Sequence, residues 1–136
     1  MKEYTYQVRV RYAETDQMGV VYHGNYAQYF EMGRVEWLRK LGVSYKWMEE
    51  NGVMLPVVSL TMNYKKPARY DDLLTVKTIL KNQTSVKIEF EYEINNESGE
   101  LLTTGYSMLV FVDMKTGRPI LPPEYVSQKI NSLLEI

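Results

Sequence analysis

The sequence predicts an α+β fold in which an antiparallel β-sheet wraps around one long central α-helix. Three observations predict it: residues 4–12 alternate as a strand does, residues 25–41 have the spacing of an amphipathic helix, and alternating segments joined by short polar loops follow from residue 54 onward. The predicted order is one strand, one long helix and then four further strands. The sheet therefore has a single long helix, which can cover one of its faces. The chain is expected to form one domain over residues 1–136.

The first strand is predicted at residues 4–12. Tyrosine and valine alternate there with threonine, glutamine and arginine, which is the period-two pattern of a strand with one buried side. Residues 13–24 are mostly polar and small around a short apolar interruption. We therefore expect a loop there that leads into the helix.

The helix prediction for residues 25–41 rests on one continuous apolar face. The members of this face recur at steps of three or four residues: Tyr26, Phe30, Gly33, Trp37 and Leu41. Asn25 is predicted as the N-cap, and Gly42 as the stop, because it directly follows the last apolar position. Residues 44–51 are predicted to add one or two further helical turns.

The rest of the chain is predicted to complete the sheet. Strands are expected at residues 54–66, 73–81, 86–94 and 101–112, hairpin loops at 82–84 and 95–99, and a short terminal helix at 123–134. Residues 86–94 are apolar on one face and charged on the other, so one side of the sheet should be packed and one solvated. Residues 101–112 carry little charge and should be central in the sheet.

A single long helix can cover only one face of such a sheet. The other face, or the edges, then needs a second subunit, which predicts a homo-oligomer. Twelve tyrosines suit such an interface or a wet pocket, because phenol combines an apolar ring with a polar tip.

The composition excludes several classes of function. Sixteen Lys and Arg against seventeen Asp and Glu give a net charge of −1, which argues against a nucleic-acid-binding protein. No apolar run approaches the ~18 residues of a membrane span and no apolar signal region is seen, so we expect a cytoplasmic protein that does not span a membrane. The absence of cysteine excludes disulfides and a cysteine nucleophile, and the single histidine, His23, excludes a multi-histidine metal site.

Residues 11–26 combine features that suit acid–base chemistry. Asp16 is a carboxylate just before an apolar stretch, where partial desolvation could raise its basicity. The predicted helix start, from His23 to Tyr26, would present free backbone N–H groups and the positive end of the helix dipole. Such donors suit a developing oxyanion. Asp16 could equally be a turn residue that bonds its own backbone, and His23 a cap or packing residue.

Other charged residues have two interpretations each. Glu31 on the helix could be solvated or paired with Arg34, one turn away. Lys65, Lys66 and Arg69 could form an ordinary exposed strand end and turn, or a small cationic patch for a phosphate group.

The segment RYAETDQMGVVYHGNY at residues 11–26 resembles the acyl-CoA thioesterases of the 4-hydroxybenzoyl-CoA thioesterase family, in particular the YbgC-like branch. Further segments carry the resemblance: YFE at 29–31, RVEWL at 34–38, PARYDD at 67–72 and TGRP at 116–119, followed by Pro122. The resemblance extends over most of the chain.

This resemblance implies the hot-dog fold, an antiparallel sheet curled round one long helix. It implies dimers or dimers of dimers with active sites at subunit interfaces, and hydrolysis of an acyl-CoA thioester to a free acid and CoA without a metal or redox cofactor. The essential aspartate of the family falls on Asp16 and its loop histidine on His23. The backbone amide that polarises the carbonyl falls on His23 or Gly24, with Tyr26 and Glu31 as further substrate-binding candidates.

Several alternatives remain open within this resemblance. Asp16 could attack the carbonyl directly or activate water as a general base. Another hot-dog branch places its carboxylate on the central helix, which makes Glu31 a secondary candidate. Lys65, Lys66 and Arg69 could hold the phosphates of CoA or an acidic acyl carrier protein. The other functions considered are an acyl carrier protein thioesterase, a dehydratase and a non-catalytic acyl-CoA-binding protein.

Overall fold

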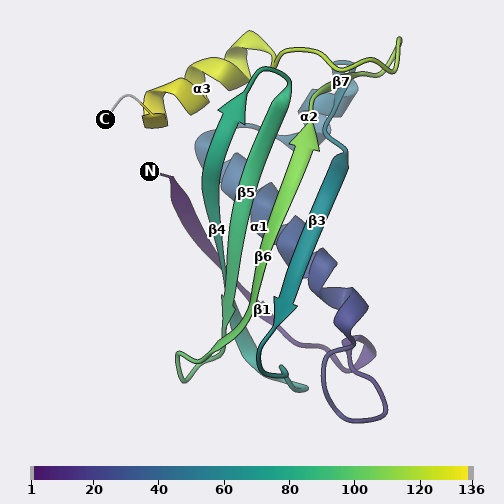
Figure 1. The fold of residues 1–136 in the computed structure, drawn as a ribbon, viewed down its shortest axis with the longest axis vertical. Helices are drawn as coiled ribbons and strands as arrows, with labels where there is room; N and C mark the ends of the chain where they lie inside the picture. The colour runs from purple at the N-terminus through teal and green to yellow at the C-terminus, as the bar shows by residue number, and fades with distance from the viewer. Residues whose placement is uncertain (1, 135–136) are drawn as a thin grey trace.

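One antiparallel sheet and one long helix dominate the computed structural model, which describes residues 2–134 (Figure 1). Five strands pair in the order β1-β4-β5-β6-β3. Their bounds are Glu3–Arg9 (β1), Val57–Tyr64 (β3), Leu73–Thr84 (β4), Lys87–Asn95 (β5) and Leu101–Val110 (β6). Helix α1, Tyr26–Leu41, lies behind these strands in Figure 1 and packs mainly against β1 and β4. The predicted α+β fold is confirmed.

Smaller elements close the two ends of the sheet. They are the 3₁₀ turns η1 (Tyr12–Glu14) and η2 (His23–Asn25), the helices α2 (Tyr45–Glu50) and α3 (Glu124–Leu134), and the short strands β2 (Val53–Met54) and β7 (Val112–Asp113). Strands β2 and β7 pair with each other in a second sheet. The loop that precedes α1 lies at the opposite end of the molecule from α2 and α3 (Figure 1).

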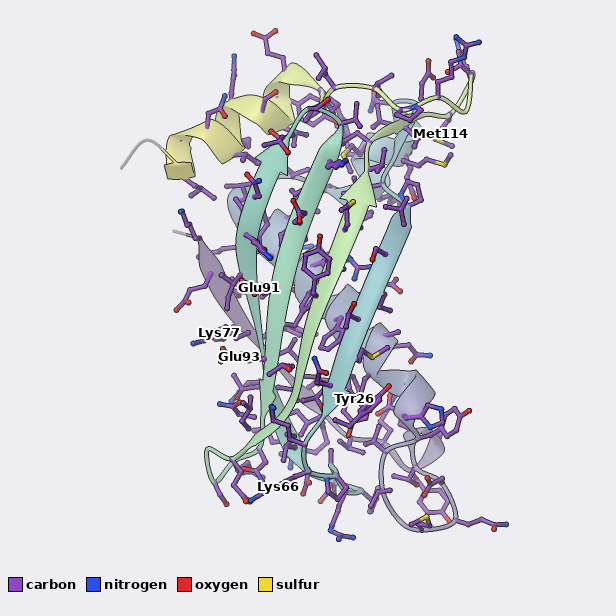
Figure 2. All side chains as sticks on the ribbon, viewed as in Figure 1. Tyr26, Lys66, Lys77, Glu91, Glu93 and Met114 are labelled. Carbon is purple, nitrogen blue, oxygen red and sulfur yellow. The ribbon has the colours of Figure 1, made fainter. Side chains whose placement is uncertain are left out.

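The core lies between α1 and the sheet, and β5 shows how the sequence pattern builds it. Its apolar side chains face the helix and are fully or almost fully buried: Ile88, Phe90, Tyr92 and Ile94. Glu91 and Glu93 lie on the opposite, outer face of the sheet, where Lys77 is 4.0 Å from Glu93 (Figure 2). The predicted division into a packed and a solvated side is confirmed.

Helix α1 approaches the sheet closely at two glycines. A Cβ atom on Gly105 of β6 would overlap the ring of Phe30, which stacks on Tyr92 with 4.4 Å between ring centroids. A Cβ atom on Gly33 of α1 would overlap the side chain of Thr78 in β4. Each glycine therefore fills a position where any larger residue would separate the helix from the sheet.

Some boundaries differ from the prediction. The segment at residues 82–84 is strand rather than loop, because a bulge follows Leu80 and the side-chain amide of Gln83 bonds two backbone carbonyls across the turn. The chain reverses at Ser85, which has φ +53°. The prediction that residues 101–112 lie inside the sheet is confirmed, because β6 lies between β5 and β3, although β5 is the middle strand of the five.

Strand β3 forms one edge of the sheet and is almost entirely exposed. Leu60 pairs with the buried Ser107, so it lies on the helix side of the sheet, yet it remains 38% exposed. Val57, Val58 and Tyr64 of this strand are also exposed. Among the described residues, no helix has the length and apolar character needed to cross a membrane.

Candidate active site

The loop before α1 holds Asp16 in a tight turn. The N–H of Asp16 donates to the carbonyl of Val20 (2.9 Å), and Oδ1 of Asp16 accepts from the N–H of Met18 (2.9 Å). Gly19 supports the turn with φ +79°, a conformation that favours glycine. The interpretation of Asp16 as a turn residue is therefore confirmed, while its second carboxylate oxygen has no hydrogen bond within residues 2–134.

Asp16 is exposed in the single chain. The partial desolvation of Asp16 that the neighbouring apolar stretch predicts is not found in the single chain, because Val21 packs into the core whereas Met18 points into solvent. The carboxylate is therefore reachable by water and by a ligand.

Glu14, which the sequence pattern did not single out, connects the loop to the helix. It is only 4% exposed. Its Oε1 accepts from the Arg11 backbone N–H (2.9 Å) and the Tyr29 hydroxyl (2.8 Å), and its Oε2 accepts from the Arg11 guanidinium. Its backbone carbonyl accepts from the N–H of Tyr22 (2.9 Å) and the side-chain amide of Asn25 (2.8 Å). One residue thus fixes both the Asp16 loop and the start of the helix.

The contacts of Glu14 shift two pKa values in opposite directions. Burial alone would raise the pKa of Glu14, but hydrogen bonds from the Arg11 backbone and from Tyr29 outweigh burial and lower the pKa below its ordinary value of 4.5. Burial and the neighbouring Glu14 carboxylate raise the pKa of Tyr29. Glu14 is therefore charged, and Tyr29 is a neutral donor, at neutral pH.

The helix start presents two unused backbone donors. The N–H of Asn25 donates to the carbonyl of Tyr22 (2.9 Å), and that of Tyr26 donates to the carbonyl of His23. For the N–H groups of His23 and Gly24, the described chain offers no hydrogen-bond partner. These are the two amides at which the carbonyl-polarising donor was expected, and the positive end of the helix dipole adds to them.

Asn25 does not cap the helix as predicted. Its side chain makes no cap bond, because its amide group instead donates to the carbonyl of Glu14. The predicted stop at Gly42 is confirmed: Gly42 has φ +99°, and its N–H bonds the carbonyls of Leu38 and Arg39.

A hollow of about 250 Å³ gathers four of the predicted residues at the helix start. Its walls are Val21, His23, Tyr26, Tyr64, Lys65, Lys66 and Pro67. Figure 2 shows Tyr26 and Lys66 at this end of the sheet. Tyr26 is buried, and burial raises its pKa, so it lines the hollow as a neutral phenol.

Tyr64 is a member of this site that sequence reasoning missed. Its hydroxyl donates to the carbonyl of His23 (3.2 Å), and its ring lies 5.4 Å from that of Tyr26 and 6.3 Å from that of His23. Its place directly before Lys65, at the end of a predicted strand, was the available signal. Tyr64 therefore connects β3 to the helix start.

The three cations of the predicted patch do not lie in one place. Lys65 and Lys66 line the hollow, but the ammonium of Lys66 is 2.7 Å from the carboxylate of Glu100. Arg69 lies outside the hollow, next to the Asp16 loop, where it forms a backbone bridge with Val20. Within the described residues, Lys65 is the cation of this hollow that has no ion pair.

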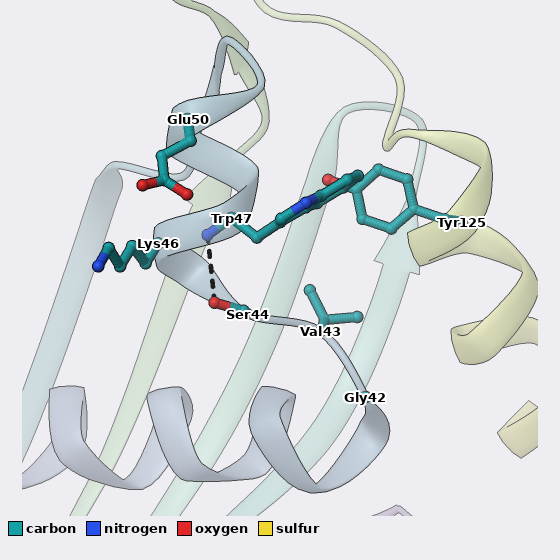
Figure 3. Close-up of a pocket in the computed structure, with 7 residues that line it drawn as sticks. All are labelled: Gly42, Val43, Ser44, Lys46, Trp47, Glu50 and Tyr125. Atoms are coloured by element: carbon teal, nitrogen blue, oxygen red, sulfur yellow. Dashed lines mark hydrogen bonds between the residues drawn. The ribbon is translucent and has the colours of Figure 1, made fainter.

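Glu31 lies elsewhere. It lines a cavity between α1 and α2 together with Arg34, and no ion pair joins the two side chains. A further cavity of about 570 Å³ lies between α2 and α3, where the rings of Trp47 and Tyr125 meet edge to face (Figure 3). Neither cavity is lined by residues of the Asp16 loop, so neither belongs to the candidate active site.

Comparison with known proteins defines the class to which this fold and loop belong. Residues 10–130 match the model of the thioesterase-like superfamily. YneP of Bacillus subtilis is 41% identical over 114 residues, which are 84% of this chain and 83% of YneP. The acyl-CoA thioester hydrolase YbgC of Escherichia coli O6:H1 is 32% identical over 126 residues, which are 92% of this chain and 94% of YbgC.

Solved structures agree with these relatives. The DHNA-CoA thioesterase of Staphylococcus aureus superposes with a TM-score of 0.94 at 39% identity, covering 98% of this chain and 92% of that one. The chain therefore belongs to the thioesterase-like superfamily. It is a thioester hydrolase of the YbgC-like family with the hot-dog fold, as the resemblance implied.

Proposed function

We propose that the protein hydrolyses acyl-CoA thioesters to a free carboxylic acid and CoA, with Asp16 as nucleophile or general base. The observation that carries the proposal is the loop itself: the Asp16 carboxylate lies in a short hairpin bridged at Thr15 and Val21, and the unused N–H groups of His23 and Gly24 follow directly after it. The names of YbgC and of the Staphylococcus aureus thioesterase support CoA thioesters as the substrate class.

The roles of these groups follow from the charge that develops in the reaction. The thioester carbonyl oxygen becomes negative when its carbon is attacked, and a preorganised N–H donor at His23 or Gly24 would stabilise it by roughly 3–4 kcal/mol. Asp16 either forms an anhydride, which water then opens, or removes a proton from the attacking water. In both routes the C–S bond breaks, and CoA leaves as a thiolate that takes up a proton.

We further propose that the hollow beside the helix start receives part of the substrate. Tyr26, Tyr64 and the His23 side chain give it an apolar and aromatic wall with polar tips. Lys65 is the cation best placed to meet a phosphate of CoA, whereas Lys66 would first have to leave Glu100. The cytoplasmic location expected from the sequence stays a prediction.

A panel of substrates tests the proposed activity. Thiol release would be followed with a dye on short, medium, long and aromatic acyl-CoAs, and on an acyl carrier protein that carries the best acyl group. Release from CoA esters by the wild-type protein supports the proposal, and the panel ranks the acyl groups. Faster release from the carrier protein would transfer the assignment to that substrate, and no release from any ester would favour a binding protein.

We also propose that two chains associate through the edge strand β3. The exposed apolar residues Val57, Val58 and Leu60, together with the open backbone of an edge strand, support this, because such edges are normally covered. An interface there would bury the helix-side surface of β3 next to Tyr64, and so would lie beside the candidate active site.

Two neighbouring positions on β3 provide a matched test of the dimer. Leu60 and Thr61 point to opposite sides of the sheet, and only Leu60 faces the helix side. Sedimentation at micromolar concentration should find at least a dimer for the wild type, a monomer for Leu60→Lys, and at least a dimer for Thr61→Lys. A wild-type protein that sediments only as a monomer would contradict the proposal.

A further inference from the structure

Asn25 joins the start of α1 to the Asp16 loop through a side-chain hydrogen bond. Its amide nitrogen donates to the backbone carbonyl of Glu14 (2.8 Å), 11 residues earlier in the chain. A carbonyl can only accept, so the NH₂ group of this side chain must make the bond. The side chain is available for this contact because it forms no cap bond to the helix. Asn25 therefore connects two segments instead of capping α1.

The Glu14 carbonyl that receives this bond also closes the hairpin of Asp16. It accepts from the N–H of Tyr22 (2.9 Å), and the N–H of Asp16 donates to the carbonyl of Val20 (2.9 Å). These two bonds bridge the two sides of the hairpin. One carbonyl oxygen thus holds the Asp16 hairpin and, through Asn25, the start of the helix.

The turn that contains Asn25 also orients the two unused N–H groups, those of His23 and Gly24. Each belongs to a planar peptide unit, so a hydrogen bond to the carbonyl of that unit fixes the direction of its N–H group. The His23 N–H shares its unit with the carbonyl of Tyr22, which accepts from the N–H of Asn25 (2.9 Å). The Gly24 N–H shares its unit with the carbonyl of His23, which accepts from the N–H of Tyr26. Both donors are thus held within the turn, and the Asn25 side chain sets where that turn lies.

We propose that Asn25 is a positioning residue, which holds the N–H groups of His23 and Gly24 in a fixed place relative to the Asp16 carboxylate. This inference rests on the proposed thioesterase activity. An oxyanion donor is effective when it is held in place before charge develops, and a displacement of about 1 Å can cost roughly 10²-fold in rate. Asn25 acts through these groups, and no contact of its own with the substrate is required.

Removal of the Asn25 side chain should lower activity far more than stability. The carbonyl of Glu14 keeps the N–H of Tyr22 as its partner, so it is not left unsatisfied, and α1 loses no cap. The unfolding midpoint should therefore fall by no more than about 5 °C. By contrast, kcat should fall about tenfold or more while KM changes less than about threefold, because the lost interaction matters in the transition state.

Matched variants separate the hydrogen bond from the space that the side chain fills. Asn25→Ala removes both, whereas Asn25→Leu removes the donor and keeps the shape, so both should lose kcat alike. Asn51 makes a bond of the same length, from its side-chain amide to the carbonyl of Trp47 (2.8 Å), at the end of α2 far from the Asp16 loop (Figure 1). Asn51→Ala and Asn51→Leu should keep the kcat of the wild type. Each Asn25 variant carries the test if the other fails to fold.

NMR relaxation of the backbone amides measures the positioning independently of activity. The order parameters of the His23 and Gly24 N–H groups should be about 0.85 in the wild type and fall towards about 0.6 in both Asn25 variants. Donors that stay rigid in both variants would overturn the proposal, as would a loss of kcat no larger than that of the Asn51 variants. A wild-type protein that hydrolyses no thioester would instead contradict the proposed function, and the order parameters alone would then confirm or overturn the positioning by Asn25.

Discussion

Asp16→Asn is expected to abolish thioester hydrolysis while the protein stays folded. Asparagine has the same shape, and its side-chain oxygen can still accept from the N–H of Met18, so the turn is preserved. It cannot act as a carboxylate nucleophile or base, and such groups contribute about 10²–10⁴-fold to rate. The measurement is kcat on the best acyl-CoA of the panel, with circular dichroism to verify folding.

Asp113→Asn is the matched control for this substitution. Oδ1 of Asp113 accepts from the N–H of Lys115 (2.9 Å), so it makes the same local turn bond as Asp16 but lies in β7, at the far end of the sheet. Its activity should equal that of the wild type. If Asp16→Asn kept more than about a tenth of kcat, a loss below about 1.4 kcal/mol, Asp16 would not be the catalytic carboxylate.

Two further variants test whether the side chains of His23 and Glu31 contribute to hydrolysis. His23→Ala should lose less activity than Asp16→Asn, because the backbone N–H that we propose for the carbonyl survives the substitution. Glu31→Ala should behave as the wild type, since Glu31 lines the α1–α2 cavity and not the hollow at the helix start. A loss at Glu31 equal to that at Asp16 would reassign the carboxylate to the helix.

Glu14→Ala is expected to lower the free energy of unfolding by about 1–3 kcal/mol. The substitution leaves the buried hydroxyl of Tyr29 without its partner, and an unsatisfied buried group costs about 1–3 kcal/mol. The exposed guanidinium of Arg11 contributes little to this figure. Urea unfolding at neutral pH measures the loss, and Glu14→Gln should fall between the wild type and Glu14→Ala.

The pH dependence of Glu14 identifies its charge as the stabilising feature. Its pKa is lower in the folded protein than the ordinary 4.5, so its contribution is present above pH 4.5 and is lost as the pH falls through the folded-state value. The advantage of the wild type over Glu14→Gln should therefore shrink on acidification. Glu36→Ala removes a similarly spaced but more exposed Arg–Glu pair and should cost much less. An equal loss at Glu36 would refute a special role for Glu14.

The sequence predicts the fold well because the burial of apolar side chains dictates the spacing of apolar residues along each strand and helix. The alternation in β5 and the apolar face of α1 appear in the structure as the two surfaces of one core. The strand at residues 82–84 was missed because its polar residues resemble a loop, and only the bulge and the bonds of Gln83 show why a strand tolerates them.

The candidate site was predictable only in part. Asp16, His23 and Gly24 come from one contiguous motif, which a sequence displays directly. Glu14 and Tyr64 act through contacts that form only on folding, across 15 residues to Tyr29 and 41 residues to His23. The pairing of Lys66 could not be predicted for the same reason, because its partner Glu100 lies 34 residues away in sequence.

The close contacts at Gly33 and Gly105 also restrict how α1 can move along its own axis. Adjacent residues of a helix are displaced by about 1.5 Å along that axis, so sliding α1 by one position would replace Gly33 with a larger residue against Thr78. The ring of Phe30, in turn, is seated over Gly105, which has room for it only because this glycine carries no side chain. Both contacts therefore resist axial translation of the helix, and so they hold the N–H groups at its start in a fixed position relative to the sheet.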